Sequence, residues 1–121
     1  MAAGRYIVEY VDAAVNFYIE PLSFETVMQA GSAFARMAKE GLTLWIAGPK
    51  VPASRPMPDG NVPKPGVWNR FVFEVDDIKA VVASLKQAGV NFRYAIVSGV
   101  DRKQILAEDP SGNAIELFQA T

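Results

Sequence analysis

The sequence contains no histidine and no cysteine. These two absences exclude metal centres built on imidazole or thiolate ligands, Ser-His-Asp and Cys-His catalysis, disulfide bonds and thiol redox chemistry. Any acid–base chemistry has to come from carboxylates, lysine, tyrosine or bound water. We therefore expect a protein that works without a cofactor.

Long apolar runs and a strong charge of one sign are absent as well. No stretch approaches the roughly 18 apolar residues of a membrane span, and residues 1–4 show no signal-peptide pattern. Twelve basic and thirteen acidic side chains give a net charge of −1, without the basic field that binding to nucleic-acid phosphates requires. We expect a cytoplasmic protein that binds neither a membrane nor a nucleic acid.

The 121 residues predict a single domain, 1–121, that is interrupted by a segment rich in proline and glycine. Nine of these residues lie between positions 48 and 66: Gly48, Pro49, Pro52, Pro56, Pro58, Gly60, Pro63, Pro65 and Gly66. Such a segment cannot hold a regular helix or a central strand, and its length suggests a lid, a binding loop or a dimer contact. We divide the domain into a first module (1–47), a bridge loop (48–66) and a second module (67–121).

The second module has the pattern of a strand, a helix and three strands. Residues 69–75 alternate apolar and polar side chains, as a strand with one buried face does. Asp76 or Asp77 caps a helix whose apolar residues recur at helical spacing until Gly89 ends it. Three further strands are predicted at 90–97, 103–108 and 113–118.

The first module repeats this pattern. A shift of 67 residues along the sequence pairs Val8 with Val75 and Val15 with Val82. The predicted elements are a strand at 5–10, a helix from Asp12 that Pro21 ends, and strands near 23–29, 33–38 and 42–47. Two tandem βαβββ modules place the chain in the α+β class.

Several short strings carry a resemblance to a known family. The strongest is Glu-Asp-Pro-Ser-Gly-Asn-Ala-Ile-Glu-Leu-Phe at 108–118, which follows 73–78 and 88–90 in the second module and 17–18 and 22–25 in the first. With these strings the chain resembles the vicinal oxygen chelate superfamily, which includes glyoxalase I, the bleomycin-resistance proteins and the extradiol dioxygenases. The resemblance implies an α+β fold in which the sheets of two βαβββ modules curve around a shared cleft, and it favours a homodimer.

In metal-dependent members of that superfamily, four pseudo-equivalent strand positions supply the metal ligands. The corresponding residues here are Ala3, Trp45, Arg70 and Glu116, of which only Glu116 matches a ligand of the family. Arg70 carries a permanent positive charge and has no acceptor atom, so it repels a divalent cation. We expect no metal site at this place.

Strand alternation places the side chains of Arg70, Val72 and Glu74 on one face, and it places Glu116 and Phe118 on one face of the last strand. The resemblance implies that these faces line the cleft. Our candidate ligand-binding residues are Arg70, Glu116, Trp45, Trp68, Phe118, Val72 and the bridge residue Arg55. Such a lining suits a small organic ligand with flat apolar parts and a polar anchor point. In the alternative reading, Arg70 and Glu116 form a structural salt bridge and the aromatic residues only pack.

Three functions remain open from the sequence. The first is a glyoxalase-like, metal-independent small-molecule binding protein of the sequestration or resistance type. The second is a lyase or isomerase in which Glu116 or Glu74 acts as general base and Arg70 holds an oxyanion. The third is an interaction module whose cleft is filled by its own side chains. Nothing in the sequence names the ligand.

Overall fold

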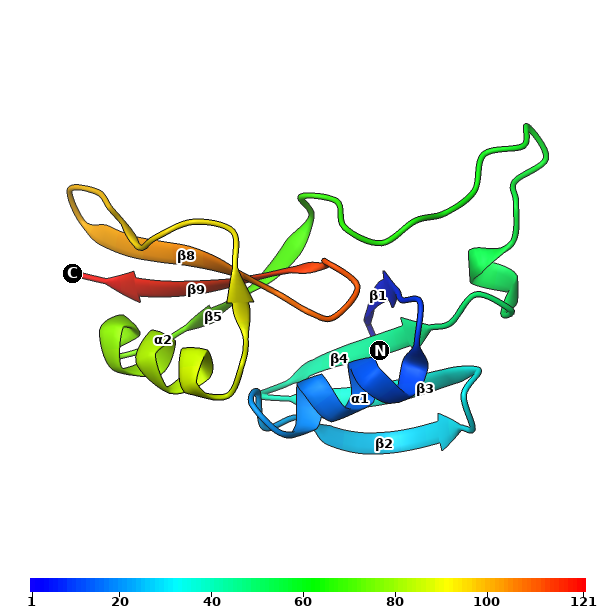
Figure 1. The fold of residues 1–121 in the computed structure, drawn as a ribbon, viewed down its shortest axis with the longest axis horizontal. Helices are drawn as coiled ribbons and strands as arrows, with labels where there is room; N and C mark the ends of the chain where they lie inside the picture. The colour runs from blue at the N-terminus through cyan, green and yellow to red at the C-terminus, as the bar shows by residue number, and fades with distance from the viewer. The chain divides into compact units, whose positions relative to one another are not determined.

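The computed structural model describes all residues, 1–121. The chain folds into two compact units, Met1–Gly66 and Val67–Thr121 (Figure 1). Each unit contains one sheet and one α-helix. Neither helix has the length and the apolar surface needed to cross a membrane.

The first unit is built on a four-stranded sheet with strand order β1-β4-β3-β2. Its elements are β1 (Gly4–Ile7), α1 (Val11–Ile19), β2 (Glu25–Ala30), β3 (Phe34–Lys39) and β4 (Leu42–Ala47). Strand β1 runs parallel to β4, and the other pairs are antiparallel. Helix α1 packs on the sheet and contributes the buried residues Val11, Ala14, Val15 and Tyr18 to the core.

A two-residue turn at Glu40 and Gly41 joins β3 to β4. Both residues have positive φ angles, 49° and 82°, as a type I′ hairpin turn requires. The turn sets the register, in which Arg36 lies opposite Trp45. Alternation then buries Met37 and its neighbours Ala35, Leu44 and Ile46 in the core, while Arg36 and Trp45 lie on the opposite face of the sheet.

The bridge loop belongs to the first unit and contains a single short 3-10 helix, η1 (Pro52–Ser54). It begins at Gly48, where a Cβ atom would lie 2.9 Å from the carbonyl oxygen of Ala33 and 2.9 Å from the side chain of Val11. The start of the bridge therefore approaches the β2–β3 connection more closely than any side chain permits.

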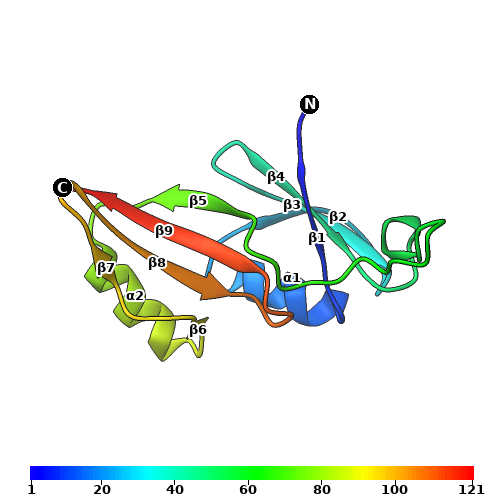
Figure 2. The ribbon, with the colours of Figure 1, turned by 90° about the horizontal axis from the view of Figure 1, so that it is seen from above.

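The second unit is a five-stranded sheet with α2 along one face (Figure 2). Its elements are β5 (Arg70–Glu74), α2 (Ile78–Gln87), β6 (Asn91–Phe92), β7 (Val97–Ser98), β8 (Arg102–Glu108) and β9 (Ala114–Ala120). Strand β5 runs parallel to β9, which pairs antiparallel with β8. The side chain of Asp77 caps α2 by accepting a hydrogen bond of 3.1 Å from the backbone N–H of Ala80.

The predicted α+β class is confirmed, and the βαβββ order is found in the first unit. In the second unit, two short strands stand where the first strand after the helix was predicted. The single strand predicted at 90–97 is wrong, because only the short strands β6 and β7 pair with β8. The strand predicted at 5–10 ends at Ile7. The first helix begins one residue before Asp12, whose carboxylate accepts hydrogen bonds from the side chains of Gln29 and Ser32.

Candidate functional site

Candidate site residues of the second unit share the face of the sheet opposite α2. Strand register places Val72 beside Glu116 and Glu74 beside Phe118. The other face carries Ile115 and Leu117, which are buried in the core with α2. The structure therefore brings Arg70, Val72, Glu74, Glu116 and Phe118 onto one surface, as strand alternation predicts.

Arg70 and Glu116 form an ion pair on this face. The Nε and Nη2 atoms of Arg70 both donate to Oε1 of Glu116, at 3.0 and 2.9 Å. A third nitrogen, Nη1, donates to the backbone oxygen of Trp68 at 3.1 Å. The Glu116 side chain is 11% exposed and that of Arg70 is 30% exposed. Because both contacts use Oε1, the second carboxylate oxygen of Glu116 is not engaged by Arg70, and two N–H groups of the guanidinium also remain.

The surface around this pair is apolar on one side and acidic at its end. Val72 is 52% exposed and Phe118 is half-buried. Glu74 is exposed and forms no ion pair. A ligand on this face would thus meet the Arg70–Glu116 pair, an apolar surface and a further carboxylate.

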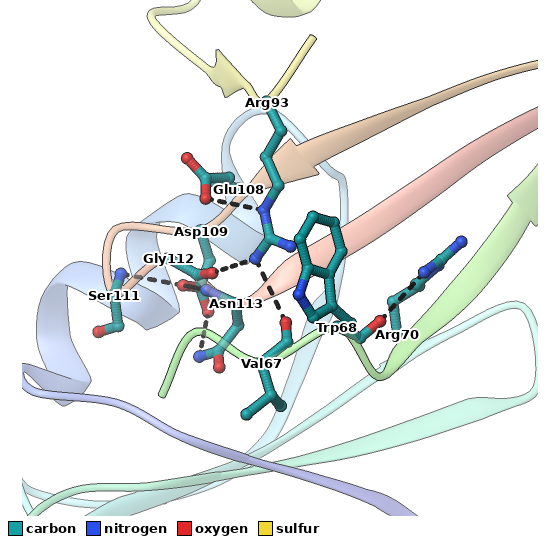
Figure 3. A network of polar contacts seen from close by, with 9 residues as sticks. All are labelled: Val67, Trp68, Arg70, Arg93, Glu108, Asp109, Ser111, Gly112 and Asn113. Carbon is teal, nitrogen blue, oxygen red and sulfur yellow. Dashed lines mark hydrogen bonds and ion pairs between the residues drawn. The ribbon is translucent and has the colours of Figure 1, made fainter. Parts of the chain in front are cut away.

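Trp68 precedes β5 and stacks on Arg93, a residue that no sequence pattern singles out (Figure 3). The guanidinium of Arg93 lies 4.7 Å from the centroid of the Trp68 ring, and its Nε donates to Oε2 of Glu108 at 2.9 Å. Its Nη2 donates to the backbone oxygens of Gly112 and Val67, at 2.8 and 3.3 Å. Arg93 therefore ties the segment that leads into β5 to the β8–β9 turn, and Trp68 remains 65% exposed.

The β8–β9 turn is built around the carboxylate of Asp109. Its Oδ1 accepts hydrogen bonds of 2.9 Å from the backbone N–H groups of Ser111 and Asn113, and its Oδ2 accepts one from the Asn113 side chain. Asp109 and Asn113 are both 4% exposed. The start of the segment 108–118, which carries the strongest family resemblance, thus forms a structural turn. The buried side chains of Asp109 and Asn113 are hydrogen-bonded to each other there.

Metal-dependent relatives imply a metal ion, and the residues present here do not fit one. A guanidinium donates to the single matching carboxylate, Glu116, where a cation would have to bind. No group of three or more His, Cys, Asp or Glu side chains is arranged to hold a metal ion anywhere in the structure. The donor set is therefore that of an ion pair and not of a coordination site.

The two remaining candidates, Trp45 and Arg55, belong to the first unit. Trp45 is half-buried on the sheet face away from α1, where it lies between Arg5 and Arg36. Arg55 is exposed directly after η1, and no hydrogen bond or ring contact joins its side chain to Trp45. The contact of Arg36 with Trp45 is not among the sequence predictions. The two-residue turn before β4 is a signal for it, because that turn places Arg36 opposite Trp45.

The sequence matches the model of the Glyoxalase/Bleomycin resistance protein/Dioxygenase superfamily over residues 3–117. No protein of curated function matches it. Among solved structures, lactoylglutathione lyase from Agrobacterium tumefaciens is similar at 18% identity and a TM-score of 0.75, covering 98% of this chain and 92% of that one. The fosfomycin resistance protein FosX from Listeria monocytogenes is similar at 14% identity and a TM-score of 0.75, covering 100% and 93%.

A third similar structure is TnmS3, an antibiotic binding protein from Streptomyces sp. CB03234, with 23% identity, a TM-score of 0.69 and coverage of 100% and 97%. At these identities the structural likenesses show the fold. The family model spans nearly the whole chain, so the resemblance noted in the sequence is confirmed. This chain belongs to the glyoxalase/bleomycin resistance protein/dioxygenase superfamily.

Proposed function

We propose that this protein binds a small organic ligand without a metal ion, in the manner of a sequestration or resistance protein. The observation that carries the proposal is the ion pair of Arg70 with Glu116, at two of the positions that the family resemblance assigns to metal ligands. FosX, a fosfomycin resistance protein, and TnmS3, an antibiotic binding protein, share the fold. Their similarity supports the proposal that this chain binds a small molecule.

The pair supplies a polar anchor for such a ligand. The unengaged oxygen of Glu116 accepts a hydrogen bond from a hydroxyl or amine, and the remaining N–H groups of Arg70 donate to a carbonyl or an oxyanion. Val72 and Phe118 offer apolar surface beside this anchor. The ring of Trp68, stacked on Arg93 but largely exposed, adds a flat surface for packing.

Thermal-shift screening of the purified protein against a library of metabolites and antibiotics tests the proposal. We expect at least one compound to raise the melting temperature, and we expect Arg70→Met combined with Glu116→Leu to abolish that effect. Arg102→Met is the matched control, because Arg102 pairs only with the exposed Asp101 at 3.5 Å. A library without any stabilising compound would instead favour an interaction module that binds no ligand.

The absence of a metal requirement is tested by elemental analysis of protein purified without a chelator. We expect well under one equivalent of zinc, iron, nickel or manganese, because Arg70 holds the carboxylate that a cation would need. One full equivalent of metal that disappears in Glu116→Gln would contradict this part of the proposal.

Glu74 favours a second candidate function, a lyase or isomerase. Its carboxylate is exposed on the same face and forms no ion pair, whereas Glu116 is already held by Arg70. Glu74 is therefore better placed than Glu116 to take a proton, with Arg70 holding the oxyanion. Progress curves with every compound that binds, measured for the wild type and Glu74→Gln, separate an enzyme from a binding protein.

We also propose that the protein is a cytoplasmic homodimer. The absence of cysteine is compatible with a reducing compartment. All six residues of the edge strand β2 are exposed, and unpaired sheet edges favour association. Sedimentation at micromolar concentration should give about twice 13.2 kDa. A clean monomer over the accessible concentration range would count against the dimer.

A further inference from the structure

Two arginines flank one tryptophan on the sheet face of the first unit that lies away from α1. Strand register aligns Arg36 on β3, Trp45 on β4 and Arg5 on β1 in one row, which Met28 extends on β2. The guanidinium carbons of Arg36 and Arg5 lie 4.2 and 5.1 Å from the centroid of the indole ring. Two cationic groups thus contact one indole ring from the strands on either side of β4.

No carboxylate neutralises these two charges. Neither Arg5 nor Arg36 takes part in a salt bridge or a side-chain hydrogen bond. Glu25 shares this face through its pairing with Ala38, but it forms no ion pair with either guanidinium. Two neighbouring positive charges without a counter-charge repel each other, and a bound anion would relieve that repulsion.

Buried donors in the same row also lack partners. The Nε atom of Arg36 and the Nε1 atom of Trp45 are shielded from solvent and make no hydrogen bond. Buried polar atoms in folded proteins are nearly always paired, so two neighbouring exceptions call for an explanation. A shift of the flexible arginine side chain toward a bound acceptor would give Nε of Arg36 a partner, and an acceptor beside the indole would give one to Nε1 of Trp45.

A hollow opens beside this row and gives a ligand access to it. Its volume is about 230 Å³, and Arg5 and Trp45 line it together with Met1, Ala3 and Gly4. Met28 is 39% exposed in the row, and the ring of Phe34 lies 5.6 Å from the guanidinium of Arg36. The surroundings of the two charges are therefore apolar and partly aromatic.

We infer that Arg5, Arg36 and Trp45 form an anion site in the first unit and that this site binds an aromatic carboxylate. The inference goes beyond the proposed function, whose polar anchor is the Arg70–Glu116 pair of the second unit. The carboxylate accepts hydrogen bonds from both guanidinium groups, and the aromatic body packs on the apolar side chains of the row. Arginine suits this task because it binds a carboxylate through two donors and stacks on aromatic rings at the same time.

Isothermal titration calorimetry with 2-naphthoate tests the inference, and 2-naphthamide serves as the uncharged counterpart. We expect the carboxylate to bind at least tenfold more tightly than the amide, with an affinity that falls as the salt concentration rises. Inorganic phosphate, which carries charge but no aromatic body, should bind more weakly than 2-naphthoate.

Variants of both arginines assign the binding to this row. Arg36→Met keeps most of the packing on the indole but removes the charge, and Arg5→Met changes an exposed side chain, so at least one variant should fold normally. We expect each variant to lose at least tenfold in affinity for 2-naphthoate, whereas Arg102→Met should bind as the wild type does. Circular dichroism spectra confirm folding before each titration.

Each contrary result has a distinct meaning. Equal affinity for the carboxylate and the amide, no binding of 2-naphthoate, or unchanged affinity in Arg5→Met and Arg36→Met would overturn the anion site. The proposed binding function would survive these results if the thermal-shift library still yields a compound that depends on Arg70 and Glu116. It would fail if that library yields no compound, or only compounds whose effect does not depend on Arg70 and Glu116.

Discussion

Breaking the Arg70–Glu116 pair from its two sides should have unequal effects on stability. Arg70→Met leaves Glu116, whose side chain is only 11% exposed, without the cation that bonds to its Oε1. Glu116→Leu leaves Arg70, which is 30% exposed and keeps its hydrogen bond to the backbone oxygen of Trp68. The loss of Arg70 should therefore cost more than the loss of Glu116.

The magnitudes follow from the exposure of the two partners. Breaking a fully buried pair by removing one partner costs about 3 to 5 kcal/mol, whereas an exposed pair contributes about 0 to 1 kcal/mol. Because Glu116 is nearly buried and Arg70 is partly solvated, we expect Arg70→Met to lower the free energy of unfolding by about 2 kcal/mol. Glu116→Leu adds apolar burial and should change it by less than about 1 kcal/mol.

The double variant completes a thermodynamic cycle. Arg70→Met with Glu116→Leu replaces both charges by apolar side chains and should regain most of the stability lost in Arg70→Met alone. Urea unfolding followed by circular dichroism at pH 7 measures all four proteins, and Arg102→Met should stay within about 0.5 kcal/mol of the wild type. The reasoning is refuted if Arg70→Met is as stable as Glu116→Leu or more stable. It is also refuted if the double variant is less stable than Arg70→Met.

Two further predictions concern the network of Figure 3 and use the same unfolding measurement. Asp109→Ala should destabilise the protein by about 2 to 3 kcal/mol, because one buried and one partly buried backbone N–H group lose their acceptor. A loss below about 0.5 kcal/mol would contradict the structural role of the turn. Arg93→Met should cost at least about 1.5 kcal/mol, because Glu108 and two backbone oxygens lose their donor. It should also make Trp68 fluorescence more accessible to acrylamide, and unchanged quenching would show that Arg93 does not hold the ring.

The order of elements could be predicted from the sequence because each unit buries one face of its sheet. Alternation at 69–75 and the helical spacing that follows it reflect that burial directly. The segment 90–97 has apolar residues at suitable spacing, but its pairing with β8 stops after the backbone N–H of Arg93 bonds to the oxygen of Leu106, and it resumes only at Val97. The side chain of Arg93 contacts Glu108, which is far away in the sequence, so no local pattern reveals that contact.

The candidate site, like the fold, could be predicted from the sequence only in part. The pairing of Arg70 with Glu116 could be expected, because both positions follow from short strings that the family shares. The row of Arg36 beside Trp45 does not emerge from a comparison of the two modules, because it depends on the residue count across the β3–β4 turn. The two unpartnered buried donors have no counterpart in sequence patterns, because they depend on how side chains cover one another.

The β3–β4 turn makes loop length a determinant of chemistry. An extra residue between Glu40 and Gly41 would shift the register of β3 against β4 by one position. Strand β3 could then keep Met37 in the core only if Met37 no longer paired with Leu44. Arg36 would then no longer stand opposite Trp45. Related chains with a longer turn should therefore lack the arginine–tryptophan stack even where both residues are present, so an insertion of one residue could change ligand preference without altering any side chain.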